Sequence, residues 1–285
     1  MKNLTISAEA TADLTPELLA KYNIDYLPMN YYLDEKEYST SDNLFTPEDF
    51  YNKMKTGSKT STSQVNEYQV EEFFKKLLEK GQDILHIAFS SALSGSCNNI
   101  MAVAERLNKE SKNKIYVVSS LCAASGHGLL AILAREKAET AETVEEVVEY
   151  VEKIKLQISH LFVVDSLKYL ARTGRVSKVT AAVGTVLQIK PVLYVDNEGH
   201  LTTKSKVISR QKSLRTIVSK LVEMKNDLSN HIIISHANCM EDAKFVQSMI
   251  KEKTGIEALI LPLGNVIGCH SGPGTLAVFF TSNAR

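Results

Sequence analysis

The sequence predicts an α/β protein of two domains. Short apolar runs bounded by turn residues alternate with amphipathic stretches of helical period, a rhythm typical of parallel strands joined by helices. The chain has 285 residues, of which 44% are apolar, so two domains can each bury a core. We expect an N-terminal three-layer α/β/α domain with a mainly parallel sheet over residues 1–155. A C-terminal α/β sandwich with a mixed sheet is expected over residues 156–285.

In the N-terminal half, Thr15-Pro16 and Thr46-Pro47 each place a capping hydroxyl before a proline suited to the first helical position. Residues 24–33 are expected to form one strand that turns back at Asp34-Glu35 as a hairpin. Residues 55–63 are small and polar and predict a loop. The other expected elements are strands at 4–6, 83–89 and 115–119, and helices at 67–80, 97–109 and up to residue 138.

In the C-terminal half, a Glu/Lys-rich helix at 143–158 is expected to link the domains. A turn of sequence DNEG at Asp196 to Gly199 predicts a hairpin of residues 191–195 and 201–206. The other expected strands are 161–164, 231–235, 258–263 and 275–280, and the expected helices are 167–171, 179–189, 209–224 and 241–253.

Between the last two strands lies a glycine-rich loop that contains His270. Glycines permit positive φ and close backbone approach, so such a loop can turn several N–H groups toward an anion, and histidine adds a further donor. The same pattern also suits a tight connection in which His270 makes a structural hydrogen bond. The residues alone leave both interpretations open.

Two other loops are rich in hydroxyl groups. One contains Thr62 and Ser63, and the other contains Ser94 and Gly95. Hydroxyls beside a helix N-terminus suit a carboxylate or phosphate, because free N–H groups and the helix dipole favour negative charge there. The alternative is that these hydroxyls only cap the helices that follow.

The bulk properties exclude several classes of protein. Lys and Arg number 33, as do Asp and Glu, so the chain lacks the basic excess of a nucleic-acid or membrane-surface binder. No apolar run reaches the length of a membrane-spanning helix, and the N-terminus does not resemble a signal peptide. Four widely spaced cysteines indicate reduced thiols and a cytoplasmic protein.

Catalytic and metal motifs are weak. His236 and Cys239 have HxxC spacing, but one pair is too little for zinc, and no phosphate-binding P-loop is present, so we expect no metal and no cofactor. The GxSxG elbow of serine hydrolases is absent. A hydrolase or acyl transferase that uses a Ser or Thr hydroxyl with His270 remains an alternative, and Cys269 is a weaker candidate nucleophile.

Five stretches in order resemble the motifs of a known family. They are Thr62-Ser63-Gln64, SSALSGS at 90–96, LKYLARTGRV at 167–176, Lys190-Pro191-Val192-Leu193, and GCHSGPG at 268–274. These stretches are similar to the signatures of the DegV family of bacterial fatty-acid-binding proteins. Together they span nearly the whole chain.

The resemblance implies a DegV-like fold with a long-chain fatty acid buried in it. By likeness, Thr62, Ser63, Ser94, Gly95 and His270 hold the carboxylate. It also implies a carrier rather than an enzyme, which presents the fatty acid to a fatty acid kinase that makes acyl phosphate for phospholipid synthesis.

The resemblance also implies a role for two arginines. By likeness, Arg175 and Arg210 are candidates for docking the kinase. The alternative is that both are solvated surface charges. Apolar residues of 129–133 and 181–189, with Phe162, are candidates for the wall of the acyl slot.

Overall fold

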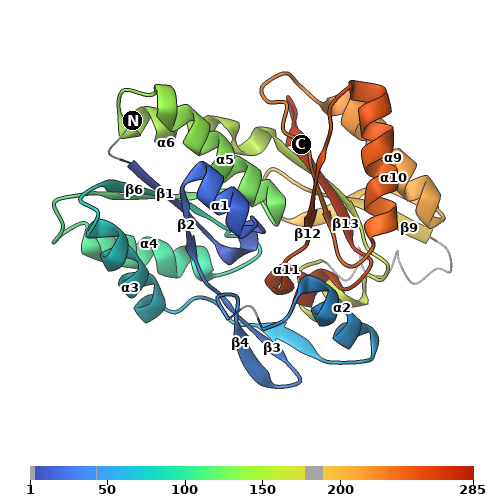
Figure 1. The fold of residues 1–285 in the computed structure, drawn as a ribbon, viewed down its shortest axis with the longest axis horizontal. Coiled ribbons are helices and arrows are strands. Elements are labelled where there is room, and N and C mark those ends of the chain that lie inside the picture. The colour runs from blue at the N-terminus through green and yellow to red at the C-terminus, as the bar shows by residue number, and fades with distance from the viewer. Residues whose placement is uncertain (1–3, 43, 177–188) are drawn as a thin grey trace.

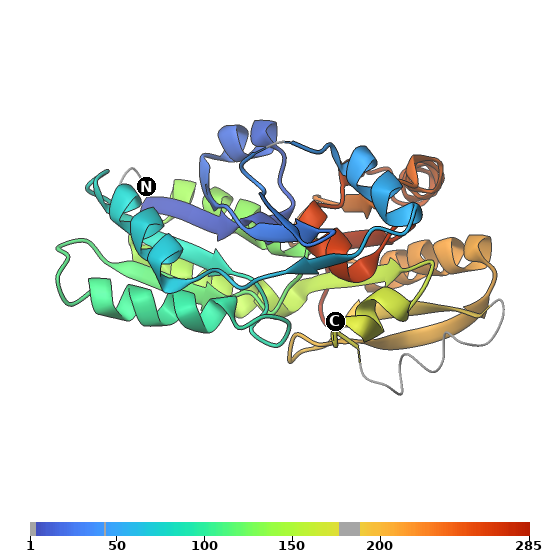
Figure 2. The same ribbon diagram turned by 90° about the horizontal axis from the view of Figure 1, so that it is seen from below.

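The computed structural model describes residues 4–42, 44–176 and 189–285. Two large sheets lie side by side along the long axis of the molecule, and a small third sheet sits at their junction (Figures 1 and 2). The α/β class with a parallel and a mixed sheet is therefore confirmed.

The N-terminal sheet is parallel throughout, in the order β2-β1-β6-β7. Helices α3 and α4 pack together below it, and α5 and α6 pack together above it, which gives the expected three layers (Figure 1). The elements are β1 (Leu4–Glu9), η1 (Ala10–Ala12), α1 (Pro16–Tyr22), β2 (Ile24–Leu27), α3 (Glu67–Leu78), β6 (Asp83–Ala88), α4 (Ser96–Leu107), β7 (Ile115–Ser119), α5 (Ser125–Thr140) and α6 (Val144–Ile154).

The C-terminal sheet is mixed, in the order β10-β9-β8-β13-β11-β12; β11 and β12 are parallel, and the other neighbouring strands described here are antiparallel. Helices α9 and α10 cover its outer face (Figure 1). The elements are β8 (Ile158–Val163), α7 (Lys168–Arg172), β9 (Ile189–Val195), β10 (Leu201–Ile208), α9 (Arg210–Met224), β11 (Ile233–His236), α10 (Met240–Thr254), β12 (Leu259–Pro262), α11 (Asn265–Ser271) and β13 (Leu276–Thr281).

The small sheet corrects two predictions. It contains β3 (Asn30–Leu33), β4 (Lys36–Ser39) and β5 (Thr60–Thr62), and α2 (Pro47–Lys55) accompanies it. The predicted strand at 24–33 is wrong, since it divides at Pro28, which has no N–H for a sheet ladder, and its halves join different sheets. The loop predicted at 55–63 is wrong at its end, because Thr60–Thr62 pairs with β3.

The connection between the halves is shorter than predicted. Helix α6 ends at Ile154, a single turn η2 (Lys155–Gln157) follows, and β8 begins at Ile158. The boundary at residues 155/156 stays a prediction. The helix predicted at 179–189 lies outside the described residues except for Ile189, which begins β9.

The inner face of the C-terminal sheet packs against the N-terminal half. Helix α5 contacts β8, β11 and β13 as well as β1 and β6. One hydrophobic cluster therefore runs through both halves, while a second lies between the C-terminal sheet and its two outer helices. Among the described helices, none is long and apolar enough to cross a bilayer.

Candidate ligand-binding site

The glycine-rich stretch before the last strand is a helix rather than a loop. Residues Asn265–Ser271 form α11, and His270 lies in its last turn. The turn that was predicted follows the helix, at Gly272 (φ 79°) and Gly274 (φ 77°), where positive φ suits glycine. The apolar residues inside the stretch favour the helix because they pack against the core.

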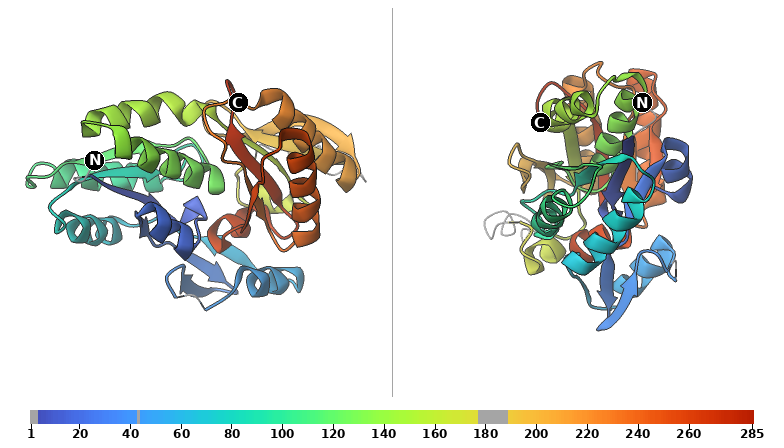
Figure 3. Two further views of the ribbon diagram at one scale, coloured as in Figure 1. Left: turned by 45° about the horizontal axis from the view of Figure 1, so that its top comes forward. Right: turned by 90° about the vertical axis from the view of Figure 1, so that its left-hand side faces the viewer.

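Helix α11 is held by the N-terminal half of the chain. Tyr51 of α2 is fully buried and donates its hydroxyl to Leu263 O at 2.8 Å. Thr60 of β5 donates to Cys269 O at 3.2 Å. A Cβ added at Gly268 would lie 2.4 Å from the Tyr51 hydroxyl oxygen, so this glycine permits the close approach. The small sheet and α2 thus fix the helix that carries His270 (Figure 3).

Thr62 and His270 meet across this contact. The Thr62 Oγ1 atom lies 2.8 Å from His270 Nε2, and His270 Nδ1 is buried without a hydrogen-bond partner among the described residues. Burial lowers the pKa of His270 to about 4, and the nearby guanidinium groups of Arg175 and Arg172 act in the same direction. When His270 is neutral, Thr62 carries one O–H proton and the imidazole carries one N–H proton. Only one of these two protons is used in the hydrogen bond between the residues. One proton is left to donate to an anion.

A cavity of about 220 Å³ opens beside this pair. Of the residues predicted for the carboxylate, Thr62, Ser63, Ser94 and His270 all line it. Gly95 does not, and instead gives room to Gln64, since a Cβ at Gly95 would lie 2.7 Å from the Gln64 side chain. Gln64 itself lines the cavity, although the resemblance placed only its neighbours Thr62 and Ser63 at the carboxylate.

The capping alternative fails for both hydroxyl loops. Asn66 caps α3, and Gln69 completes a capping box with it, so Thr62 and Ser63 are not caps. Ser94 accepts a hydrogen bond from the Ser96 N–H at 3.2 Å, but the N-cap of α4 is Gly95, and no described side chain caps this helix. Thr62 and Ser63 are therefore available to a ligand.

Arg175 lies in the wall of the cavity. Its Nε donates to Leu93 O at 3.3 Å, and burial lowers its pKa. It also borders an open groove that shares Thr62 and His270 with the cavity and adds Lys59 and Arg172. The polar end of the cavity thus faces a cationic groove at the surface.

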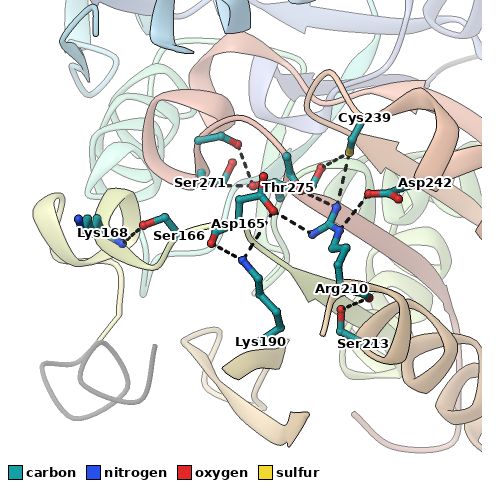
Figure 4. A network of polar contacts seen from close by, with 12 residues as sticks. Asp165, Ser166, Lys168, Lys190, Arg210, Ser213, Cys239, Asp242, Ser271 and Thr275 are labelled. Carbon is teal, nitrogen blue, oxygen red and sulfur yellow. Dashed lines mark hydrogen bonds and ion pairs between the residues drawn. The ribbon is translucent and has the colours of Figure 1, made fainter. Parts of the chain in front are cut away.

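Arg210 lies outside the cavity, in the network of Figure 4. Its Nε donates to Asp242 at 2.9 Å, and its Nη2 donates to Gly274 O at 2.7 Å. Asp165 lies 3.8 Å from Nη1. Arg210 therefore braces the turn that follows α11.

Most of the cavity wall is apolar. Phe162 lines it as expected, whereas residues 129–133 are buried in the core and do not, and residues 181–188 lie outside the described residues. Strand alternation could have identified further members, because Ala277 and Phe279 follow Thr275 at spacing two. The apolar lining residues are Met29, Phe89, Leu93, Ala123, Ala124, Phe162, Leu170, Val195, Leu201, Leu263, Val266, Ile267, Ala277 and Phe279.

The alternative chemistries find little support in the described part of the chain. No group of three or more His, Cys, Asp or Glu side chains there could hold a metal ion. Cys269 is fully buried, and desolvation raises the pKa of its thiol to about 12, so it is not a thiolate nucleophile. Within residues 4–42, 44–176 and 189–285, His270 Nδ1 has no partner of the kind that orients the histidine of a catalytic triad.

Comparisons with known proteins agree on one family. A profile described as an uncharacterised protein of the DegV family matches residues 3–283. A DegV domain-containing protein of Clostridium perfringens is 38% identical over 289 residues, which cover 100% of this chain and 99% of the relative. A DegV domain-containing protein of Lactococcus lactis is 32% identical over 97% of each chain.

Solved structures show the same fold. A Thermotoga maritima protein, whose structure is described as revealing a fatty acid binding function, is 26% identical with a TM-score of 0.83 and covers 98% of this chain and 99% of its own. DegV of Bacillus subtilis, described as a fatty acid binding protein, is 25% identical with a TM-score of 0.84 over 99% of both chains.

Proposed function

This chain belongs to the DegV family, and we propose that it binds one long-chain fatty acid, with the carboxylate at Thr62 and His270 and the acyl chain in the cavity. The observation that carries the proposal is the pairing, in one cavity, of an unused donor with an apolar wall. Such a division suits an amphiphile with a small anionic head. The relatives described as fatty-acid-binding proteins support the same ligand class.

The head-group site is built to stabilise a negative charge. A buried carboxylate is costly unless hydrogen bonds satisfy it, and charge-assisted bonds are the strong ones. Thr62 and His270 offer one donor between them, Ser63 and Ser94 add hydroxyls, and Arg175 adds a cation. Gly95 contributes indirectly, because its missing side chain leaves space for Gln64.

Carrier function fits this chemistry better than catalysis. A general base works best with a pKa near the operating pH, whereas the pKa of His270 is about 4. The Thr62–His270 hydrogen bond still makes an acyl-transferring hydroxyl the second candidate function.

We further propose that the bound fatty acid is presented to a fatty acid kinase in the cytoplasm, for acyl-phosphate formation in phospholipid synthesis. The polar end of the cavity borders an open groove with Lys59, Arg172 and Arg175, so a partner could reach the carboxylate there. Arg175 is the better placed of the two docking candidates. Arg210 is 19% exposed at its side chain and would act mainly through the turn that it braces.

Binding of a fluorescent fatty acid to delipidated protein tests the anchor. Thr62→Val and His270→Ala each remove part of a buried anion site, which costs about 1.5–3 kcal/mol, or roughly 10- to 100-fold in Kd. Ser61→Ala is the matched control, because Ser61 is an exposed neighbour in the same strand and does not line the cavity.

Two outcomes would count against the proposal. Unchanged affinity in both variants would remove Thr62 and His270 from the site. Turnover of a generic acyl ester by the wild type, lost in Thr62→Val, would favour the second candidate function over a carrier.

A further inference from the structure

The paired strands β8 and β13 show how the cavity is oriented in the fold. In the antiparallel ladder of β8 and β13, Ala277 lies opposite Phe162 and Phe279 lies opposite His160, and all four side chains line the cavity. The ladder begins at Leu276. Thr275, the residue before it, also lines the cavity and donates its hydroxyl to Ser271 O at 3.1 Å, next to His270. The four residue steps from Thr275 to Phe279 cover about 13 Å of extended chain. The cavity therefore runs from the head-group site toward the Phe279–His160 pair.

His160 is a polar residue that presents a neutral ring to this apolar space. Its Nδ1 lies 3.0 Å from Ile158 O, which can only accept, so Nδ1 carries the proton. Its Nε2 lies 3.2 Å from the Ala123 N–H, which can only donate, so Nε2 does not. Both nitrogens are satisfied within the protein, and no donor or acceptor of the ring is left for a ligand.

The His160 ring is closely packed on two sides. The Phe279 ring meets it edge-on, with centroids 5.4 Å apart and planes at 86°. On another side, a Cβ added at Gly126 would lie 2.2 Å from His160 Nε2, so the α5 backbone touches the imidazole. His160 is 2% exposed. With these neighbours it has no room to turn aside for a longer ligand.

Arg285 fixes the backbone segments that pack against His160. Its guanidinium donates to Leu121 O at 2.7 Å, to Lys155 O at 2.6 Å and to Ile158 O at 3.0 Å, so it shares Ile158 O with His160. Leu121 has a positive φ of 51°, a conformation that costs a non-glycine residue energy and persists where neighbours fix it. The loop that ends in Ala123 is thereby held against the imidazole.

We propose that His160 and Phe279 form the end stop of the acyl slot and set the longest chain that this protein accommodates. The inference rests on the proposed fatty-acid function and assigns a specificity-determining role to residues outside the head-group site. An acyl chain that reaches His160 meets a ring that cannot move and a guanidinium that holds the loop behind it.

The test measures Kd for a series of saturated fatty acids of increasing length. Each further methylene that becomes buried tightens binding roughly 3- to 4-fold. For the wild type we expect this gain to stop at one chain length and affinity to fall beyond it. His160→Ala and Phe279→Leu remove atoms from the stop, so the chain length of tightest binding should increase in both.

Leu161→Ala is the matched control. Leu161 neighbours His160 in β8 but faces the outer cluster, so its truncation removes a buried side chain without reaching the slot. Its optimum should equal that of the wild type. Phe279→Leu keeps the test decisive if His160→Ala fails to fold.

An unchanged optimum in a folded His160→Ala or Phe279→Leu protein that still binds fatty acids would overturn the end stop and leave the proposed function standing. An equal shift in Leu161→Ala would also overturn it, since the effect would then be one of general loosening. If wild-type protein binds no fatty acid of any length, the proposed function itself falls.

Discussion

At the residue scale, His270 shows how burial selects one protonation state. Desolvation and two arginines lower its pKa to about 4, so the imidazole is neutral near pH 7. A neutral ring can share a proton with Thr62 and still leave one donor for a carboxylate. A charged ring would instead add a third cation beside Arg172 and Arg175.

The depressed pKa of His270 predicts an acid-dependent loss of stability in the ligand-free protein. In the unfolded chain His270 binds a proton below its ordinary pKa of about 6.5, whereas in the folded protein it does so only below about pH 4. The free energy of unfolding therefore decreases as the pH falls from about 6.5 to about 4. Between pH 7 and pH 4 this contribution is about 3 kcal/mol. Urea unfolding of His270→Gln should lose that much less stability over the same range. Parallel pH profiles for the two proteins would contradict the account.

The contact between Gly268 and Tyr51 gives a second prediction at this scale. A Cβ at Gly268 would lie 2.4 Å from the Tyr51 hydroxyl, and overpacking of this kind costs about 1–3 kcal/mol. Gly268→Ala should therefore destabilise the protein, and should do so by less in a Tyr51→Phe background, where the clashing oxygen is gone. A double-mutant cycle measures the difference. Additive effects would mean that the two residues do not press on each other.

Part of the site could be predicted from the sequence at this scale. Thr62, Ser63, Ser94 and His270 stand out as hydroxyls and a histidine among small residues, and they do share one cavity. The placement of Arg175 in the wall could not be predicted, because local sequence does not show which loops meet. The same limit hid His160, whose role depends on pairing with Phe279 more than a hundred residues away.

At the element scale, helix capping and ligand binding are assigned to different residues: Asn66 caps α3, and Thr62 of β5 lines the cavity. Asn66 forms the capping box of α3, so Asn66→Ala should cost about 1 kcal/mol of stability. Fatty-acid affinity should stay near the wild-type value, because Asn66 does not line the cavity. Thr62→Val should show the reverse, with weaker binding and a smaller loss of stability. Thermal unfolding and ligand titration of both variants check this, and the opposite pattern would return Thr62 to a capping role.

The errors in the predicted elements have local causes. Glycine-rich sequence favours a loop, but α11 forms because Val266 and Cys269 are buried and Tyr51 occupies the space left by Gly268. Tertiary packing there outweighs the low helix propensity of glycine. Short strands such as β5 are also hard to predict, since three polar residues carry no clear period.

At the scale of the whole molecule, the two halves share a core. Helix α5 packs on both large sheets, and the main hydrophobic cluster includes Ile6 of the first and Phe279 of the last strand. We therefore expect the protein to unfold in one cooperative step, with coincident transitions by circular dichroism and by tyrosine fluorescence. Two separate transitions would show that the halves fold independently.

The α/β class and the mixed character of the second sheet were predictable, because they follow from the alternation of apolar runs and helical periods. The pairing of the small sheet with α11 was not. That contact joins residues about 200 positions apart, such as Thr60 and Cys269, and it brings the hydroxyl of Thr62 to His270. The site therefore depends on a long-range contact that local patterns do not encode.

Native mass spectrometry of the freshly purified protein, followed by lipid extraction, tests whether one fatty acid occupies the cavity. We expect a population heavier than the bare chain by the mass of one long-chain fatty acid, and release of that fatty acid on denaturation. Protein of the bare mass alone, which also fails to bind when titrated with long-chain fatty acids after delipidation, would contradict it.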